Sequence, residues 1–163
     1  MTQSTSAARS VRPIPEGYHT VTPTLIIQGA AQAIDFYVRA FGAKELGRMP
    51  SPDGRIAHAE LQIGDARLML ADEFPEMGGR APQTLGGTPV SLHLYVEDAD
   101  AVFQRAVNAG ATVLQPLEDA FWGDRYGRLT DPFGHQWSIG THIEDISEAE
   151  MRQRMQAFTP SSA

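Results

Sequence analysis

The stretch that decides the fold runs from residue 21 to residue 42 and reads VTPTLIIQGAAQAIDFYVRAFG. Its first seven residues are short and rich in β-branched side chains, which predicts a strand over residues 21–27. Apolar residues then recur at helical spacing, which predicts a helix over residues 30–41 with one buried face. Gly42 fits the end of that helix, because glycine adopts the left-handed conformation without a steric penalty.

Three further strands are predicted on the C-terminal side of this stretch, at residues 43–48, 58–63 and 66–71, with turn residues between them. The order strand, helix, strand, strand, strand then occurs a second time. In this second unit the strands are predicted at residues 90–96, 112–115, 125–130 and 136–141, and the helix at residues 99–108. Asp98 is a suitable N-cap for that helix.

Matching landmarks recur at a nearly constant spacing in the two units. The helix-ending glycines Gly42 and Gly110 are 68 positions apart, and the turn glycines Gly64 and Gly134 are 70 positions apart. A duplicated unit should show such small drifts at loops and helix ends. We therefore predict an α+β fold of two βαβββ modules that form a curved mixed sheet with a concave pocket.

The chain is expected to form one domain with five segments. These are a disordered leader at residues 1–17, the first module at 18–72, a linker rich in Gly and Pro at 73–89, the second module at 90–142, and a C-terminal helix and tail at 143–163. In the last segment Ser147 and Glu150 have the spacing of a helix capping box.

The composition argues against several kinds of site and partner. The chain has no cysteine, which excludes disulfides, thiolate metal sites and cysteine nucleophiles. A net charge of −7, with Lys44 as the only lysine, argues against a nucleic-acid partner. No stretch approaches the roughly 18 apolar residues of a membrane span, and the polar N-terminus has no secretory signal pattern. We therefore expect a cytoplasmic protein with no nucleic-acid or membrane partner.

Three motifs resemble those of a known family: AIDFY (33–37) followed by FGA (41–43), LYVED (94–98) and DPFGH (131–135). They are similar to motifs of the vicinal oxygen chelate superfamily, which includes glyoxalases, bleomycin-resistance proteins and extradiol dioxygenases. The stretches HAELQIGDARLML and FWGDRYGRLTDPFGHQWSI resemble its PhnB-like glyoxalase/bleomycin-resistance subgroup. The resemblance implies the glyoxalase/bleomycin-resistance fold and a homodimer, whose modules pair either within or between chains.

In metal-dependent members of this family, two His and one or two Glu hold a divalent cation on the concave face. The resemblance places the four ligand positions at Thr22, Leu68 (or its neighbour Met69), Ser91 and Ser138. None of these side chains is a good anchor for such a cation beside imidazole or carboxylate. We therefore predict that the family metal site is vacant and that the chain has no cofactor.

Strand alternation predicts which side chains line the concave face. The predicted ligand-binding residues are Thr22, Thr24, His58, Glu60, Ser91, His93, Tyr95, Trp122, Arg125 and Ser138. Trp122 and Arg125 are included because FWGDRY (121–126) resembles the ligand groove of bleomycin-resistance proteins, where an aromatic ring can stack on a planar drug. A competing interpretation is that Trp122 covers the core and that Asp124 and Arg125 form a surface ion pair.

Two functions of different classes fit these residues. The first is binding of a small organic molecule in a metal-free groove, with sequestration of an antibiotic as one use. The alternative is a metal-dependent lyase, isomerase or dioxygenase with a displaced site for Zn, Ni, Mn or Fe at His58, Glu60 and His93. His93 is the predicted catalytic residue, also as the base of a metal-free enzyme, because imidazole exchanges protons near neutral pH. A third possibility is a homologue that works only through protein partners.

Overall fold

The computed structural model describes residues 11–158 and consists of two modules with the same order of elements. The first module comprises β1 (Thr24–Ile27), α1 (Ala30–Phe41), β2 (Lys44–Pro50), β3 (Ile56–Ile63) and β4 (Ala66–Asp72). The second comprises β5 (Ser91–Tyr95), α3 (Ala99–Ala109), β6 (Thr112–Asp119), β7 (Asp124–Thr130) and β8 (Gln136–His142). The predicted α+β fold of two βαβββ modules is thus confirmed.

The remaining helices lie outside the two modules. A 3₁₀ turn η1 (Pro75–Met77) and a short helix α2 (Pro82–Leu85) lie in the segment predicted as a linker, and α4 (Glu148–Ala157) follows the last strand. The predicted leader and tail lie partly outside the described residues, at 1–10 and 159–163. Among the helices that the structure describes, none has the length and apolar character needed to cross a membrane.

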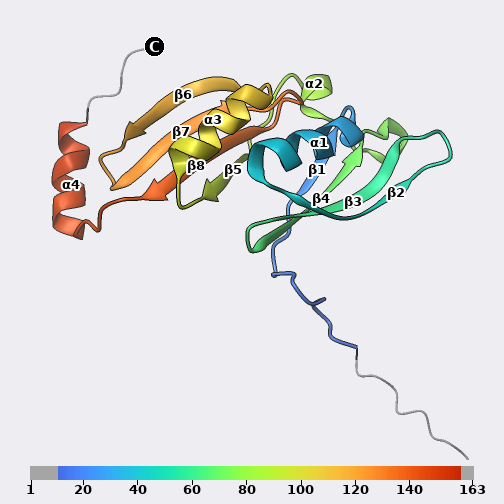
Figure 1. Ribbon diagram of the computed structural model, residues 1–163, viewed down its shortest axis with the longest axis horizontal. Helices are drawn as coiled ribbons and strands as arrows, with labels where there is room; N and C mark the ends of the chain where they lie inside the picture. The colour runs from blue at the N-terminus through green and yellow to red at the C-terminus, as the bar shows by residue number, and fades with distance from the viewer. Residues whose placement is uncertain (1–10, 159–163) are drawn as a thin grey trace, which may run out of the picture.

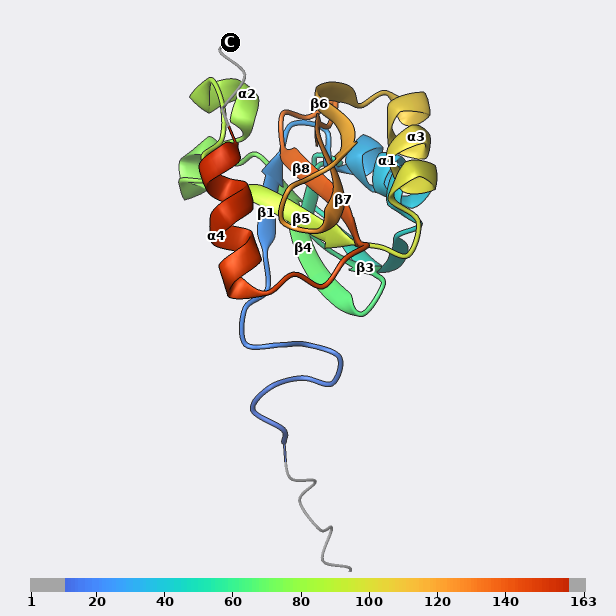
Figure 2. The same ribbon diagram turned by 90° about the vertical axis from the view of Figure 1, so that its left-hand side faces the viewer.

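Each module forms a mixed four-stranded sheet, with strand orders β1-β4-β3-β2 and β5-β8-β7-β6. The first and last strand of each module pair in parallel, and the other neighbours are antiparallel. Helices α1 and α3 lie side by side on the same side of the two sheets (Figures 1 and 2). We call the other side of each sheet its open face. It carries Thr24, His58, Glu60, Arg67 and Met69 in the first module, and Ser91, His93, Tyr95, Tyr126 and Ser138 in the second.

The helix sides of the two sheets share one hydrophobic core, which joins the modules. Trp137 of β8 packs against Tyr37 and Phe41 of α1, with ring centroids 5.3 and 4.7 Å apart. The Tyr37 hydroxyl and the Trp137 indole N–H both donate to the buried carboxylate of Asp131, at 2.7 and 2.9 Å. A buried carboxylate is stable only with such donors, so Asp131 ties the first module to the second.

The two helices begin in the same way although different side chains cap them. In the first module Asp72 Oδ1 accepts from the backbone N–H groups of Gly29 and Ala30, at 3.0 and 2.9 Å. In the second module the hydroxyl of Thr141 accepts from the N–H of Ala99 at 2.9 Å. Thr141 stands 69 positions after Asp72 in the sequence. Asp72 is the last residue of β4 and Thr141 the last but one of β8, and both satisfy donors that the first turn of a helix leaves free.

The strand boundaries agree with the prediction to within two residues except at the start of β1 and the end of β6. Strand β1 begins at Thr24 and not at residue 21, because Pro23 has no N–H to donate to the ladder. Strand β6 continues to Asp119, through residues that were predicted as a loop. The N-cap prediction for Asp98 is confirmed, since its side chain accepts from the N–H of Ala101 at 3.0 Å. Ser147 likewise caps α4.

Candidate functional site

Strand register shows which face carries each side chain at the positions that the family resemblance implies. Met69 lies on the open face of the first module and pairs with Glu60 and Thr24. Leu68 points to the core and is only 6% exposed, so the prediction that Leu68 occupies the second position is wrong. Ser138 is on the open face of the second module, and Thr22 precedes β1.

The side chains at these positions do not fit a divalent cation. Thr22, Ser91 and Ser138 offer neutral hydroxyls, and Met69 offers a thioether, which prefers soft monovalent copper. Zn, Ni, Mn and Fe in proteins are held by imidazole, carboxylate or thiolate groups. These four side chains therefore do not form a donor set for such a cation.

The alternative metal site at His58, Glu60 and His93 is wrong for a single chain. His58 Nε2 and Glu60 Oε1 lie 3.2 Å apart on β3, but His93 lies in the second module beside Ser138. Within residues 11–158, no group of three or more His, Asp or Glu side chains is arranged to hold a metal ion. The strand alternation that groups His58 with Glu60 is correct, but it gives no information about the distance between modules.

His93 is the central polar residue on the open face of the second module. Its Nδ1 lies 2.7 Å from the Ser138 hydroxyl, a hydrogen-bond distance. Gly140 of β8 leaves room for the imidazole, because a Cβ there would come within 3.1 Å of His93 Cε1. Partial burial lowers the pKa of His93, although the Asp124 carboxylate acts to raise it. His93 is therefore a neutral imidazole near pH 7, able to accept a proton or share a hydrogen bond.

Four aromatic side chains adjoin one another across this face, and we call them the aromatic row: Tyr95, His93, Tyr126 and Trp122. The ring centroids of His93 and Tyr95 are 4.4 Å apart, those of His93 and Tyr126 are 6.0 Å apart, and those of Tyr126 and Trp122 are 5.1 Å apart. Tyr95 at one end is 66% exposed. Such a row offers ring faces and edges to a planar ligand.

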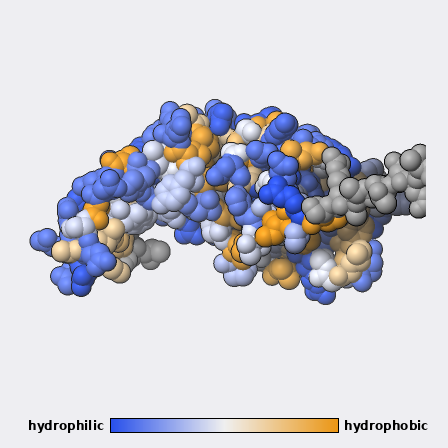
Figure 3. Space-filling view, turned by 90° about the horizontal axis from the view of Figure 1, so that it is seen from below, coloured by the Kyte–Doolittle hydropathy of each residue, from blue (hydrophilic) through white to orange (hydrophobic). Residues whose placement is uncertain are grey.

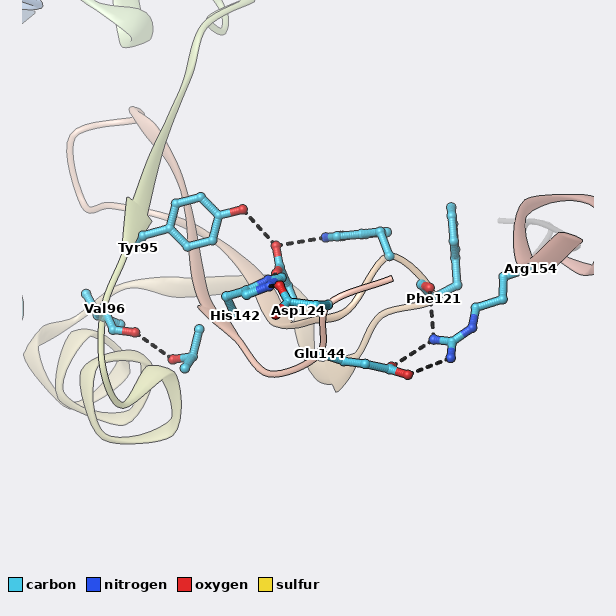
Figure 4. Close-up of polar contacts among 10 residues, drawn as sticks. Tyr95, Val96, Phe121, Asp124, His142, Glu144 and Arg154 are labelled. Atoms are coloured by element: carbon cyan, nitrogen blue, oxygen red, sulfur yellow. Dashed lines mark hydrogen bonds and ion pairs between the residues drawn. The ribbon is translucent and has the colours of Figure 1, made fainter. Parts of the chain in front are cut away.

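Asp124 connects the two ends of the aromatic row, and the sequence did not reveal this role. Its Oδ2 accepts from the Tyr95 hydroxyl at 2.8 Å and from the Trp122 indole N–H at 3.1 Å (Figure 4). Its Oδ1 lies 2.8 Å from Nδ1 of His142. The only signal in the sequence is the position of Asp124 within FWGDRY (121–126), a stretch for which a surface ion pair with Arg125 was one of two competing interpretations.

Two predictions for FWGDRY (121–126) are corrected by the structure. Arg125 points to the helix side of the sheet, where it pairs with Asp100 and Asp119 at 2.9 and 3.2 Å, and so lies away from the open face. The predicted ion pair between Asp124 and Arg125 does not form, because Asp124 is on the opposite side of β7. Trp122 does lie on the open face, half-buried in the aromatic row.

The open face of the first module has a different character, because residues 13–22 lie over it. Gly17 and Tyr18 pack against Arg67, with the guanidinium 4.6 Å from the Tyr18 ring centroid. A groove of about 580 Å³ lies between this segment and Glu60 and Met69. In the view from below, the molecule has an arched outline and a mostly hydrophilic surface with scattered hydrophobic residues (Figure 3).

Comparison with known proteins assigns the family. Residues 19–139 match the model of the Glyoxalase/Bleomycin resistance protein/Dioxygenase superfamily. An uncharacterized protein of Mycobacterium bovis is 54% identical over 138 residues, which cover 83% of this chain and 91% of that protein. The crystal structure of TioX from Micromonospora sp. ML1 is 32% identical, with a TM-score of 0.61, and covers 75% of this chain and 97% of its own. Protein PA1353 from Pseudomonas aeruginosa is 28% identical, with a TM-score of 0.62, covering 76% of this chain and 98% of its own. The chain therefore belongs to the glyoxalase/bleomycin resistance/dioxygenase superfamily.

Proposed function

We propose that the protein binds a small planar organic molecule on the open face of its second module, without a metal ion. The observation that carries this proposal is the aromatic row beside His93 and Ser138. Aromatic rings supply stacking surface, and the Ser138 and Ser91 hydroxyls with the His93 imidazole supply hydrogen bonds that orient a polar edge. The hydroxyl and thioether groups at the family ligand positions favour binding over metal-assisted chemistry.

The two tryptophans make this proposal testable by fluorescence. Trp122 belongs to the aromatic row, whereas Trp137 is 1% exposed in the core. A planar ligand that stacks on the row should quench Trp122 and leave Trp137 unchanged. We expect bleomycin, or a member of a panel of planar bicyclic aromatic compounds, to quench the emission saturably and to raise the melting temperature.

The matched control is Trp122→Phe, which keeps a ring in the row but removes the reporter. Its remaining emission should not respond to the same compounds. An equal response in wild type and Trp122→Phe would place the ligand elsewhere, and the absence of any saturable response across the panel would overturn the proposal.

A second candidate function is proton transfer with His93 as the base. The observation that favours it is a neutral imidazole on an exposed face, hydrogen-bonded to Ser138. Such a base could remove the proton next to a carbonyl group. Proton–deuterium exchange of dihydroxyacetone in D₂O, followed by NMR, should then exceed the buffer rate and fall to it in His93→Ala. Equal exchange in both proteins would reject this candidate.

We also propose that two copies of the chain associate, as the family resemblance implies. The positions of β1 and β5 at the edges of their sheets, together with the exposed Met155 of α4 and the exposed Phe158 that follows it, support an additional partner surface. Light scattering after size-exclusion chromatography should give a mass near twice the 17.8 kDa of one chain. A mass of one chain at micromolar concentration would contradict the dimer. It would not affect the ligand proposal, which the fluorescence titration tests separately.

A further inference from the structure

We propose that Asp124 is a positioning residue for the ligand face, whose carboxylate holds Tyr95 and Trp122 at a fixed separation at the two ends of the aromatic row. This inference rests on the proposed function only for which face binds the ligand. The hydrogen bonds of Asp124 are present without any ligand. It assigns to Asp124 a role that requires no contact with the ligand.

The environment of Asp124 is unusual for an acidic side chain. Asp124 is only 3% exposed although it begins β7 on the open face. Burying a carboxylate is costly unless donors surround it, and three side chains donate or share hydrogen bonds here. Within the described part of the chain its ion-pair partner is His142, with no arginine or lysine. Burial acts to raise the pKa of Asp124, but hydrogen bonds from His142, Tyr95 and Trp122 leave it below the usual value.

The convergence of donors matters because Tyr95 and Trp122 come from elements that do not pair with each other. Tyr95 ends β5, at the edge of its sheet, whereas Trp122 lies in the turn between β6 and β7. Both donate to the same oxygen, Asp124 Oδ2, so one atom sets the distance between the two ring systems (Figure 4). Rings held in place before binding lose less conformational freedom when a ligand stacks on them.

The turn that carries Trp122 is itself braced from behind. The Gly123 carbonyl accepts from the N–H groups of Ile143 and Glu144, at 2.9 and 3.0 Å. Arg154 of α4 donates to the Phe121 carbonyl at 3.3 Å and pairs with Glu144 at 2.7 Å (Figure 4). The backbone of the turn is therefore fixed by residues 143–144, which follow β8, and by α4. The Trp122 ring packs on Phe121 and Tyr126, and its hydrogen bond goes to Asp124.

The test replaces Asp124 by its amide. In Asp124→Asn the volume is kept, but the charged acceptor shared by both rings is lost. We expect a weaker near-ultraviolet circular dichroism signal from the aromatic row without ligand, an unchanged far-ultraviolet spectrum, and about tenfold weaker binding of the compound that quenches Trp122. Asp100→Asn is the matched control, because Asp100 is an exposed carboxylate that pairs with Arg125 on the helix side. It should leave both readouts at wild-type values.

A second variant covers the case in which Asp124→Asn does not fold. Tyr95→Phe keeps the exposed ring and removes only its hydrogen bond to Asp124, and it should reproduce part of the loss in near-ultraviolet signal and affinity. Wild-type spectra and affinity in both Asp124→Asn and Tyr95→Phe would overturn the inference while leaving the proposed function intact. If wild type binds none of the compounds, the proposed function fails, and the near-ultraviolet signal alone decides whether Asp124 positions the rings.

Discussion

The open faces of the two modules have the same backbone and different chemistry. Thr24 pairs with Met69 in the first module, and His93 pairs with Ser138 at the equivalent place in the second. Residues 13–22 lie over the first face, whereas Tyr95 on the second is 66% exposed. Under the proposed function, this difference predicts that the two faces contribute unequally to ligand binding and that the second module supplies most of the groups that contact the ligand.

The helix sides of the modules, in contrast, remain alike. Each helix is capped from the end of the last strand, by Asp72 in one module and Thr141 in the other. Each helix also ends at a glycine in the left-handed conformation, Gly42 or Gly110. Folding depends on these caps and on the shared core, whereas the open faces are free to vary. The comparison therefore separates positions that carry stability from positions to which the proposed function assigns ligand recognition.

The largest effect is expected where the two modules are joined. Asp131→Ala removes the acceptor for the Tyr37 hydroxyl and the Trp137 indole N–H, both of which stay buried. Each donor left unsatisfied costs about 1–3 kcal/mol, so we expect the free energy of unfolding to fall by about 3 kcal/mol. Urea denaturation followed by circular dichroism measures this change.

The control for Asp131→Ala is Asp53→Ala, which removes an exposed carboxylate from the turn between β2 and β3. Exposed ion pairs contribute at most about 1 kcal/mol, so its loss should be much smaller. Equal losses in the two variants would show that Asp131 does not hold the modules together.

The second prediction compares equivalent positions on the two open faces. His93→Ala removes a ring from the aromatic row and the partner of Ser138, and it should weaken binding of the quenching compound about tenfold, or about 1.4 kcal/mol. Thr24→Ala changes the equivalent residue of the first module and should leave the affinity near the wild-type value. Fluorescence titration gives both numbers. Equal losses would mean that both faces contact the ligand.

The sequence predicted those features that depend on local interactions. The caps Asp98 and Ser147 and the helix end at Gly42 follow from residues within one or two turns, and the structure confirms them. The family resemblance likewise depends on short motifs of consecutive residues, and the match to the family model confirms it. Local signals are reliable at these three helix ends because each is formed by residues close to it in the sequence. The start of α1, which Asp72 caps from the end of β4, is not formed in this way.

The candidate site was harder to predict because it depends on register and on contacts between distant segments. A shift of one residue moves a strand side chain to the other face, which is why Leu68 was placed wrongly. Arg125 was assigned to the groove from the family resemblance, which does not specify the face of β7 on which its side chain lies. The role of Asp124 requires β5, the turn before β7 and the end of β8 to meet. The alternation of side chains along one strand does not predict which distant segments of the chain lie next to that strand.

The third prediction concerns the segment of residues 13–22 that lies over the open face of the first module. Tyr18→Ala removes the ring that packs on the guanidinium of Arg67, and it should lower the free energy of unfolding by about 1 kcal/mol. The same change should not alter binding at the second face. Tyr95→Ala is the opposite case, since it should weaken binding and change stability little. Denaturation and fluorescence titration of both variants test the separation, and a loss of binding in Tyr18→Ala would contradict it.

The smallest expected effect is a separation of two histidine titrations on the second open face. Carboxylates raise the pKa of His142, with Asp145 contributing first and Asp124 next, whereas partial burial lowers the pKa of His93. The stabilising contribution of His142 is therefore present below the ordinary value of about 6.5 and is lost as the pH rises through its raised pKa. For His93 the neutral form favours the folded state. This stabilising contribution is present above the ordinary pKa of about 6.5 and is lost as the pH falls through the lowered pKa of His93.

Proton NMR of the imidazole C2–H resonances measures both values in one titration. We expect His93 to titrate at lower pH than His142, and ligand affinity to fall on acidification as His93 gains its proton. In Asp124→Asn the pKa of His142 should move down while Asp145 still holds it above the ordinary value, because only one of its two carboxylate partners is removed. Coincident titrations in the wild type would show that the aromatic row and Asp124 do not separate the environments of these two imidazoles.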